Sequence, residues 1–205
     1  LHYTIDLKSP KNLETIRKYS REMVPNDIKI RPINKSDWER EVRSVVSIFN
    51  ESLARLWGNV PFDPDEFIEF ANEFKSLILP EFWLIAETGG KAVGFVGSFP
   101  QYSAVFKDLD GRIKPQSLIK FPLQMRGIRE GVIMIVGLID EYKGRNLGKV
   151  LLGRACDVIV EKGYDKAIPT WALEDNLKSR RILEDLGGKV DIHWEMYSKT
   201  PALSE

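Results

Sequence analysis

The chain has 205 residues, of which 43% are hydrophobic, and its 30 basic and 30 acidic side chains give a formal net charge of +0. This composition is typical of a globular protein with a sizeable core, and it offers no excess charge for nucleic acid. One cysteine and two histidines argue against a disulfide framework or a zinc site. The chain has no apolar run long enough to span a membrane and no signal pattern. We therefore expect a cytoplasmic protein without a metal ion and without nucleic-acid or membrane partners.

The N-terminal part predicts a strand over 3–7, a helix over 12–23 and a strand over 28–33. A piece of about 30 residues is too short to bury a core by itself. We therefore interpret residues 1–27 as a strand–helix extension or as the remnant of an upstream domain. Residues 28–200 form the main domain in this interpretation.

The next stretch predicts two helices, two strands and a loop. Helical spacing of apolar residues runs over 38–57, and a second helix follows over 63–79. Strands are expected over 82–87 and 92–99, with a glycine-rich hairpin turn between them. The segment 100–122 is irregular, and long loops inside a compact domain are often functional.

The last third alternates strands and helices, which is typical of an α/β protein. A long apolar strand is expected over 125–139, a loop and helix over 143–162, and a strand over 166–173. A short helix over 176–186 and an alternating strand over 190–197 close the sheet. Glycines interrupt the strand 125–139, and glycine inside a strand indicates a bulge or a close approach to the backbone.

A basic loop follows this apolar strand, with the sequence Lys143-Gly144-Arg145-Asn146-Leu147-Gly148. The first turn of a helix leaves backbone N–H groups without partners, and these groups attract phosphate together with the helix dipole. The loop lacks the spacing and the Ser/Thr of a Walker A motif. It also lacks the glycine triplet of a Rossmann fingerprint.

The loop resembles motif A of the GNAT (Gcn5-related N-acetyltransferase) superfamily, in which [RQ]-x-x-G-x-[GA] follows a hydrophobic strand. Residues 171–188 resemble motif B of the same superfamily, and the segment 99–121 is similar to an enlarged loop in an uncharacterised branch of it. The resemblance implies a mixed α/β fold with flanking helices. Its mostly antiparallel sheet splays between the fourth and fifth strands.

The resemblance also implies acetyl-CoA (or coenzyme A) as co-substrate and a set of residues that would bind it. The end of the apolar strand would hold the pantetheine arm, the loop would hold the pyrophosphate, and two residues after the next strand would line the other side. These residues are Leu138, Ile139, Asp140, Lys143, Gly144, Arg145, Asn146, Leu147, Gly148, Lys149, Asn176 and Ser179.

Three positions depart from the family pattern. Lys143 replaces the usual Arg or Gln, and Asn146 replaces the first glycine of the loop. Asn is the non-glycine residue best suited to a positive φ, so we expect the turn to survive. Leu183 stands where many family members place a tyrosine that protonates the leaving thiolate.

The catalytic candidates are therefore residues near the expected opening of the sheet. Glu141 is a candidate base, as are Glu87 and Asp140, and Tyr102 and Tyr142 are candidate acids. Two alternatives stay open: Glu141 as a surface carboxylate that balances a lysine, and Tyr142 as a packing residue.

The leading hypothesis is an acyl-CoA-dependent N-acyltransferase that acts on the amine of a small molecule or peptide by direct attack in a ternary complex. One alternative is a non-catalytic CoA-binding module of the same shape, which the departures at Lys143 and Leu183 favour. The other is an acyltransferase that uses aminoacyl-tRNA as donor. The long loop before the apolar strand would also suit a homodimer.

Overall fold

The computed structural model describes residues 1–22, 24–54, 56, 58–108, 126–195 and 197. The strands are β1 (His2–Asp6), β2 (Lys29–Pro32), β3 (Trp83–Thr88), β4 (Lys91–Pro100), β5 (Glu130–Leu138), β6 (Lys166–Pro169) and β7 (Gly188–Ile192). They form one sheet in the order β2-β3-β4-β5-β6-β1-β7. Only the β5–β6 pair is parallel among these neighbours, which confirms the expected mixed, mostly antiparallel sheet.

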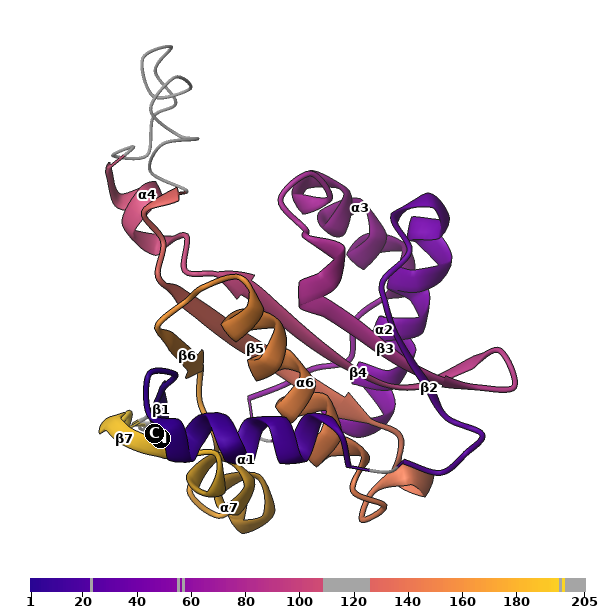
Figure 1. The fold of residues 1–205 in the computed structure, drawn as a ribbon. Coiled ribbons are helices and arrows are strands. Elements are labelled where there is room, and N and C mark those ends of the chain that lie inside the picture. The colour runs from indigo at the N-terminus through magenta and orange to yellow at the C-terminus, as the bar shows by residue number, and fades with distance from the viewer. Residues whose placement is uncertain (23, 55, 57, 109–125, 196, 198–205) are drawn as a thin grey trace, which may run out of the picture.

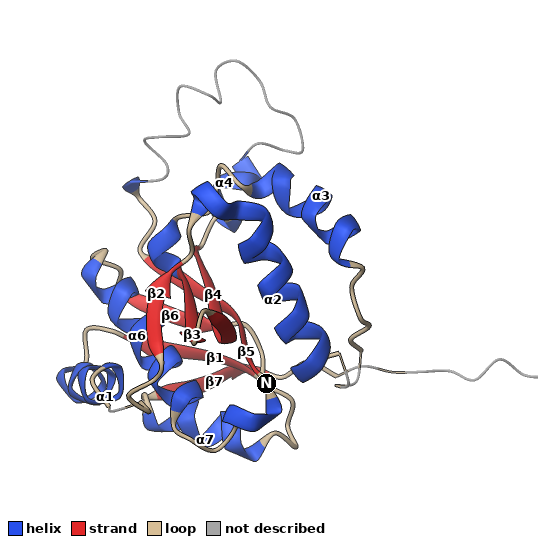
Figure 2. Ribbon diagram, turned by 90° about the vertical axis from the view of Figure 1, so that its right-hand side faces the viewer, coloured by secondary structure: helices blue, strands red, loops and turns tan. Residues whose placement is uncertain are grey.

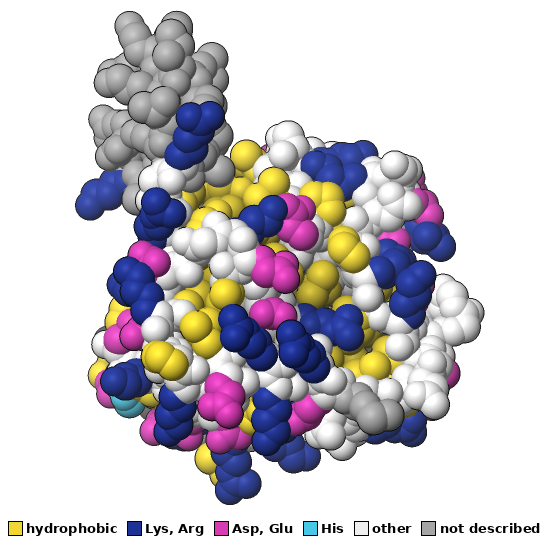
Figure 3. All heavy atoms as spheres, viewed as in Figure 1, with side chains coloured by type: hydrophobic (Ala, Val, Ile, Leu, Met, Phe, Trp, Pro, Cys, Tyr) yellow, Lys and Arg dark blue, Asp and Glu magenta, His cyan; other side chains and the backbone are white. Residues whose placement is uncertain are grey.

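Helices cover both faces of this sheet. They are α1 (Pro10–Ser20), α2 (Trp38–Ser52), α3 (Pro64–Phe74), α4 (Ser103–Asp108), α6 (Leu147–Glu161) and α7 (Leu177–Asp185). Helices α2 and α3 lie on one face and α1 and α6 on the other (Figure 2). On the face seen in Figure 3, basic and acidic side chains lie interspersed, in keeping with the zero net charge.

The expected elements are present, but several boundaries differ. The helix predicted over 38–57 ends at Ser52, because Leu53 leaves the helical conformation with φ −120°. The helix predicted to Leu79 ends at Phe74. The strand predicted over 190–197 is Gly188–Ile192. The prediction of an irregular segment over 100–122 is wrong for Ser103–Asp108, which forms α4, and its part from 109 onward lies outside the described residues.

The N-terminal segment is built into the sheet. Strand β1 lies between β6 and β7 and is antiparallel to both. Helix α1 packs closely against α6 at Gly153, where an added Cβ would lie 2.6 Å from the Cβ of Tyr19. Residues 1–27 therefore share one core with the rest of the described chain. That they derive from an upstream domain stays a prediction.

A buried ion cluster joins β2, β3 and α2. Glu41 is 2% exposed, and its carboxylate accepts hydrogen bonds from Arg31 Nη1 at 3.0 Å and Nη2 at 2.8 Å. Arg31 Nε donates to Glu87 Oε2 at 2.8 Å. The Arg31 guanidinium makes the hydrogen bonds that this buried carboxylate needs, and Arg40 Nη2 adds a longer ionic contact at 3.6 Å.

Replacing Glu41 by alanine should lower the free energy of unfolding by about 3 kcal/mol, because one partner of a buried pair is lost and its guanidinium keeps only part of its hydrogen bonding. Urea unfolding of E41A measures this loss. The matched control is E39A, because Glu39 also pairs with an arginine but is 67% exposed, and it should change stability far less. Equal losses in both variants would contradict this account of the cluster.

Candidate functional site

The sheet opens at a β-bulge in β5. Between the pairs Gly97↔Ile135 and Ser98↔Ile133 the register advances by one residue on β4 and by two on β5, so Met134 is the extra residue. A bulge bends its strand and increases the local twist. The sequence predicts that the glycines of this strand mark a bulge or a close approach to the backbone. The bulge lies at Met134, and the close approach is found at Gly131 and Gly137, where an added Cβ would lie 2.8 Å from Ile159 and 2.5 Å from Phe95.

Strand β6 separates from β5 at this point. Their pairing ends at Ile133↔Pro169, and the Thr170 N–H then donates to Ile133 O at 3.1 Å. Thr170 Oγ1 donates to Met134 O at 3.1 Å, while β5 continues to Leu138. Counted from β2, the opening lies between the fourth and fifth strands, as the family resemblance implies. The strand expected over 166–173 ends at Pro169 because its partner turns away.

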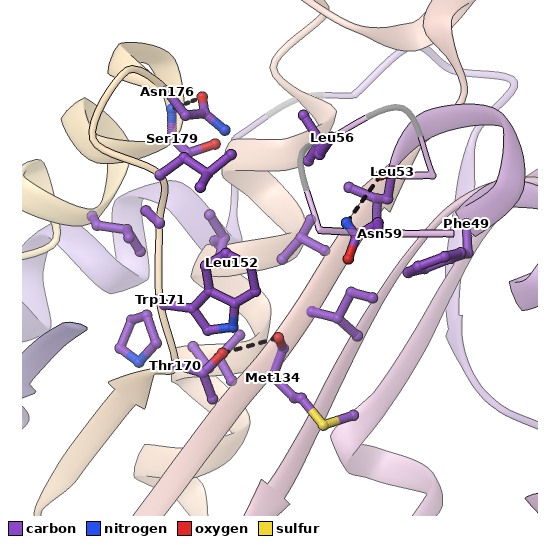
Figure 4. Close-up of a pocket in the computed structure, with 17 residues that line it drawn as sticks. Phe49, Leu53, Leu56, Asn59, Met134, Leu152, Thr170, Trp171, Asn176 and Ser179 are labelled. Carbon is purple, nitrogen blue, oxygen red and sulfur yellow. Dashed lines mark hydrogen bonds between the residues drawn. The ribbon is translucent and has the colours of Figure 1, made fainter. Parts of the chain in front are cut away.

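A cavity of about 230 Å³ occupies this opening (Figure 4). Its walls come from the end of α2, from β5 at the bulge, from the segment that follows β6, and from α7. The lining is mainly apolar: Phe49, Leu53, Leu56, Ile133, Met134, Ile135, Val136, Leu152, Pro169, Trp171, Ala172, Leu173 and Leu183. An apolar cleft with few polar groups is the usual form of a small-molecule site.

The polar side chains of the cavity also shape its walls. Asn59 Nδ2 donates to Leu53 O at 3.0 Å and holds the segment after α2. Asn176 caps α7 by accepting from the Ser179 N–H at 3.2 Å. Asn176 and Ser179 were expected to border the ligand, and both line the cavity (Figure 4). Leu183 also lines it, one helical turn beyond Ser179.

The basic loop lies beyond the carboxyl end of β5 and leads into α6. Gly144 has φ 82° and Asn146 has φ 62°, so both adopt the left-handed conformation. The expected role of Asn146 as a substitute for glycine is thus confirmed in its backbone. Leu147, the first residue of α6, is fully buried, whereas residues 143–146 are exposed. The start of the helix is anchored in the core while the loop before it faces solvent.

Gly148 allows a close contact between α6 and β5. A Cβ added at Gly148 would lie 3.1 Å from the Cδ1 of Leu138. The exposed loop therefore stays against the end of β5, where N–H groups of the first helical turn can meet an anion.

Internal contacts engage the basic side chains around the loop. Lys143 Nζ lies 2.6 Å from Asp140 Oδ1, and the Arg145 guanidinium lies 5.2 Å from the Tyr142 ring centre. Lys149 Nζ pairs with Glu22 at 2.8 Å and lies 4.0 Å from the Tyr19 ring. Although both lysines are paired, the Lys143 side chain is 50% exposed and that of Lys149 only 25%, so Lys143 and the exposed Arg145 are more accessible to an incoming anion than Lys149.

The three residues expected to contact the pantetheine arm differ in their hydrogen bonding and exposure. The Ile139 N–H donates to Val93 O at 3.1 Å, which commits that amide to β4. Leu138 packs against Gly148, and Asp140 is exposed beside Lys143. These residues continue β5 past the stretch 133–136 that lines the cavity.

The structure does not bring the catalytic candidates together. Glu141 is exposed, and Tyr142 is buried beneath Arg145, as expected for a packing residue. Tyr102 follows the end of β4, and its hydroxyl donates to Leu77 O at 3.2 Å. Burial raises the pKa of the Tyr102 phenol to about 12. The base candidate Glu87 is held by Arg31.

Sequence reasoning missed the apolar wall of the cavity. Phe49 lies on α2 and Trp171 follows β6, and each is one of several aromatic residues with ordinary core spacing. Trp171 is large, partly exposed and placed directly after a strand, and this was the available signal. Its meaning depends on where β5 bends, which the sequence does not reveal.

None of the helices in the described chain is long and apolar enough to cross a membrane. Within the same residues, no group of three or more His, Cys, Asp and Glu side chains could hold a metal ion.

Comparison with known proteins identifies relatives. The sequence model described as "Acetyltransferase (GNAT) family" matches residues 42–187. Protein YghO of Escherichia coli (strain K12) is 27% identical over 184 residues, which are 87% of this chain and 47% of that protein. The bacterial ceramide synthase of Caulobacter vibrioides (strain NA1000 / CB15N) is 24% identical over 182 residues, which are 86% of this chain and 47% of the relative. The chain thus spans about half the length of these curated relatives.

A solved structure shares the fold. The structure of yncA from Salmonella typhimurium with its cofactor acetyl-CoA aligns with a TM-score of 0.51 and 18% sequence identity. The alignment covers 79% of this chain and 79% of that chain.

Asn146→Val should destabilise the chain by about 1–2 kcal/mol, because a β-branched residue is strained at positive φ. Asn146→Gly should leave the free energy of unfolding near its original value, since glycine adopts this conformation freely. Urea unfolding of both variants measures the difference. If the valine and glycine variants were equally stable, the left-handed conformation at this position would be refuted.

Proposed function

This chain belongs to the acetyltransferase (GNAT) family, and on that premise we propose that it transfers an acyl group from a coenzyme A thioester to an amine. The single observation that carries the proposal is the opening of the sheet at the Met134 bulge beside a left-handed loop at the start of α6. A cleft for the thioester arm and amides for its diphosphate thus lie along one strand. Acetyl is the first acyl group to test.

The loop residues fit the anionic part of such a donor. The Lys143 N–H donates to Asp140 O, so the amides proposed for the anion are those of residues 144–146 and of the first turn of α6, and the Lys143 and Arg145 side chains add positive charge. Leu138 and Asp140 would flank the arm, and Asn176 and Ser179 would border it from α7. The structure of yncA, a protein of the same fold, contains acetyl-CoA, which supports a coenzyme A thioester as the donor.

The acceptor is proposed to be the amine of a small molecule or peptide that enters the cavity. The mainly apolar lining favours an acceptor or acyl group with a hydrocarbon part. One relative is a bacterial ceramide synthase, and a ceramide is an amide of a long-chain amine. Long-chain amines therefore stand among the small molecules to be tested.

The thioester, when bound, supplies an activated carbonyl and a thiolate leaving group. The chain must hold the amine nitrogen and the carbonyl carbon together, and such positioning lowers the barrier by itself. It must also receive the proton that the amine loses and return one to the thiolate. Glu141 remains the proposed base. Tyr142 is buried as a packing residue and Tyr102 follows the end of β4, away from Leu138, so we assign the acid role to neither and propose water as the proton source. Of these three candidate side chains, Glu141 is the exposed one next to the loop.

Titration of the 205-residue chain with coenzyme A tests the donor site. The melting temperature should rise with concentration, and at a hundredfold excess over Kd the stabilisation should be about 2.7 kcal/mol. Asn146→Val should reduce this effect, and Glu14→Gln on the exposed face of α1 is the control that should keep it. A melting temperature that stays flat up to millimolar coenzyme A refutes the proposal.

The two other readings of the site predict different results. A non-catalytic binding module would show the coenzyme A effect without releasing thiol from acetyl-CoA in the presence of amines. An acyltransferase that uses aminoacyl-tRNA would show neither stabilisation by coenzyme A nor release of thiol from acetyl-CoA. A homodimer and a cytoplasmic location stay predictions, which sedimentation and cell fractionation test.

Leu183→Tyr tests whether a missing acid limits turnover. Leu183 is buried and lines the cavity, so a tyrosine there would bring a phenol to the proposed leaving thiolate. The size-matched control is Leu183→Phe, which has the ring without the hydroxyl. Leu183→Tyr should exceed Leu183→Phe in kcat by at least about tenfold, since general acids contribute more than that in many enzymes. Equal kcat values, with equal coenzyme A stabilisation, would show that the proton comes from elsewhere.

A further inference from the structure

A continuous strip of phenylalanine rings runs from the cavity along α3. Neighbouring ring centres lie 4.7, 4.9, 5.8 and 5.0 Å apart. We call this set the aromatic strip; in order it comprises Phe49, Phe62, Phe67, Phe70 and Phe74. Phe49 lines the cavity (Figure 4) and also contacts Phe62 of the strip, so the two surfaces are continuous.

Much of the strip faces solvent. Phe62 is 38% exposed, Phe70 56% and Phe74 40%, and none of the residues of α3 is buried. Exposed aromatic side chains cost solvation free energy, and when contiguous they usually mark a binding surface. Helix α3 rises about 16 Å over its length, which suits an extended hydrocarbon chain better than a two-carbon acetyl group.

The strip is held in a fixed position on α2. Asn50 Nδ2 donates to Phe62 O and the Phe62 N–H donates to Asn50 Oδ1, each at 2.9 Å. Asp63 then caps α3 by accepting from the N–H groups of Asp65 and Glu66. These contacts place Phe62 between the cavity and the first turn of α3.

The charge around the strip selects the kind of molecule that fits. Residues 62–74 contain five carboxylates and no Lys or Arg: Asp63, Asp65, Glu66, Glu69 and Glu73. One of these, Asp65, pairs with Arg43 at 2.6 Å. A helix with aromatic and acidic side chains attracts a cation that carries an apolar chain, and it repels an anionic bilayer surface.

We propose that the aromatic strip binds the hydrocarbon chain of a long-chain primary amine and leads its amino group to the cavity. This rests on the proposed function, because it identifies the amine acceptor as a cationic amphiphile. The hydrocarbon chain of the amine packs along Phe62, Phe70 and Phe74. The carboxylates of α3 raise the local concentration of the ammonium group, and the amine reaches the Met134 bulge past Phe49.

Calorimetric titration with n-butylamine, n-octylamine and n-dodecylamine, each below its micelle concentration, tests the strip. The affinity should rise about two- to fourfold for each added methylene. The double variant Phe70→Ser/Phe74→Ser should flatten this dependence, and because both side chains are exposed it should still fold. The matched control is Val190→Ser/Ile192→Ser, which removes comparably exposed apolar side chains from β7 and should keep the dependence.

A charge variant distinguishes the contribution of the ammonium group to binding from that of the hydrocarbon chain. Glu69→Gln/Glu73→Gln should weaken n-dodecylamine binding severalfold and leave n-dodecanol binding unchanged, with Glu14→Gln as control.

An unchanged chain-length dependence in the Phe70/Phe74 variant overturns the proposal. It is also overturned if the wild type forms a dimer that this variant abolishes, or if it sediments with anionic phosphatidylglycerol vesicles through the strip.

The coenzyme A titration keeps this inference distinct from the proposed function. Coenzyme A stabilisation without chain-length dependence would refute the strip and leave the acyltransferase proposal standing. Chain-length dependence without coenzyme A stabilisation would refute the acyltransferase proposal and leave the strip as a binding site for amphiphiles.

Discussion

The extra residue at Met134 is the constraint on which the rest of the site depends. Strand β5 pairs with β4 along its whole length, so the bulge bends it without detaching it. Strand β6 follows β5 only to Ile133, and Thr170 ends the ladder with hydrogen bonds to the carbonyls of Ile133 and Met134. An unbulged strand would let the parallel pairing continue. Side chains of β6 would then fill the space that α2 and α7 now border.

The loop before α6 depends on a second constraint: the first residue of the helix is buried, whereas the loop residues just before it are exposed. Leu147 is sealed in the core and fixes where the helix starts, while Gly144 and Asn146 turn the exposed chain into it. Gly148 keeps this start against Leu138 of β5. The helix N-terminus and the sheet opening are thereby tied to the same strand. The proposed site for the diphosphate and the proposed site for the thioester arm can therefore both lie along β5.

Part of the site could be predicted because its conformation is local. A left-handed residue at Asn146 follows from its amide side chain, whereas the cap at Asn176, which was expected inside the helix, is a finding of the structure. The position of the candidate acid Tyr102 could not be predicted in this way, because it depends on how the strands pair. Because β4 runs antiparallel to β5, the residue after β4 lies near the start of β5 and away from Leu138. Lys149 shows the same limit, since its amine pairs with Glu22, which lies just after the end of α1.

By itself, the sequence determined the order of the helices and strands apart from α4, and the left-handed turn into α6, because these depend on residues within a few positions of one another. Only the tertiary structure decided the place of β1 inside the sheet, the register that makes Met134 a bulge, and the meeting of Phe49 and Trp171 at one cavity. These features depend on contacts between segments far apart in the chain. Their free energy comes from packing and strand pairing that no local pattern contains.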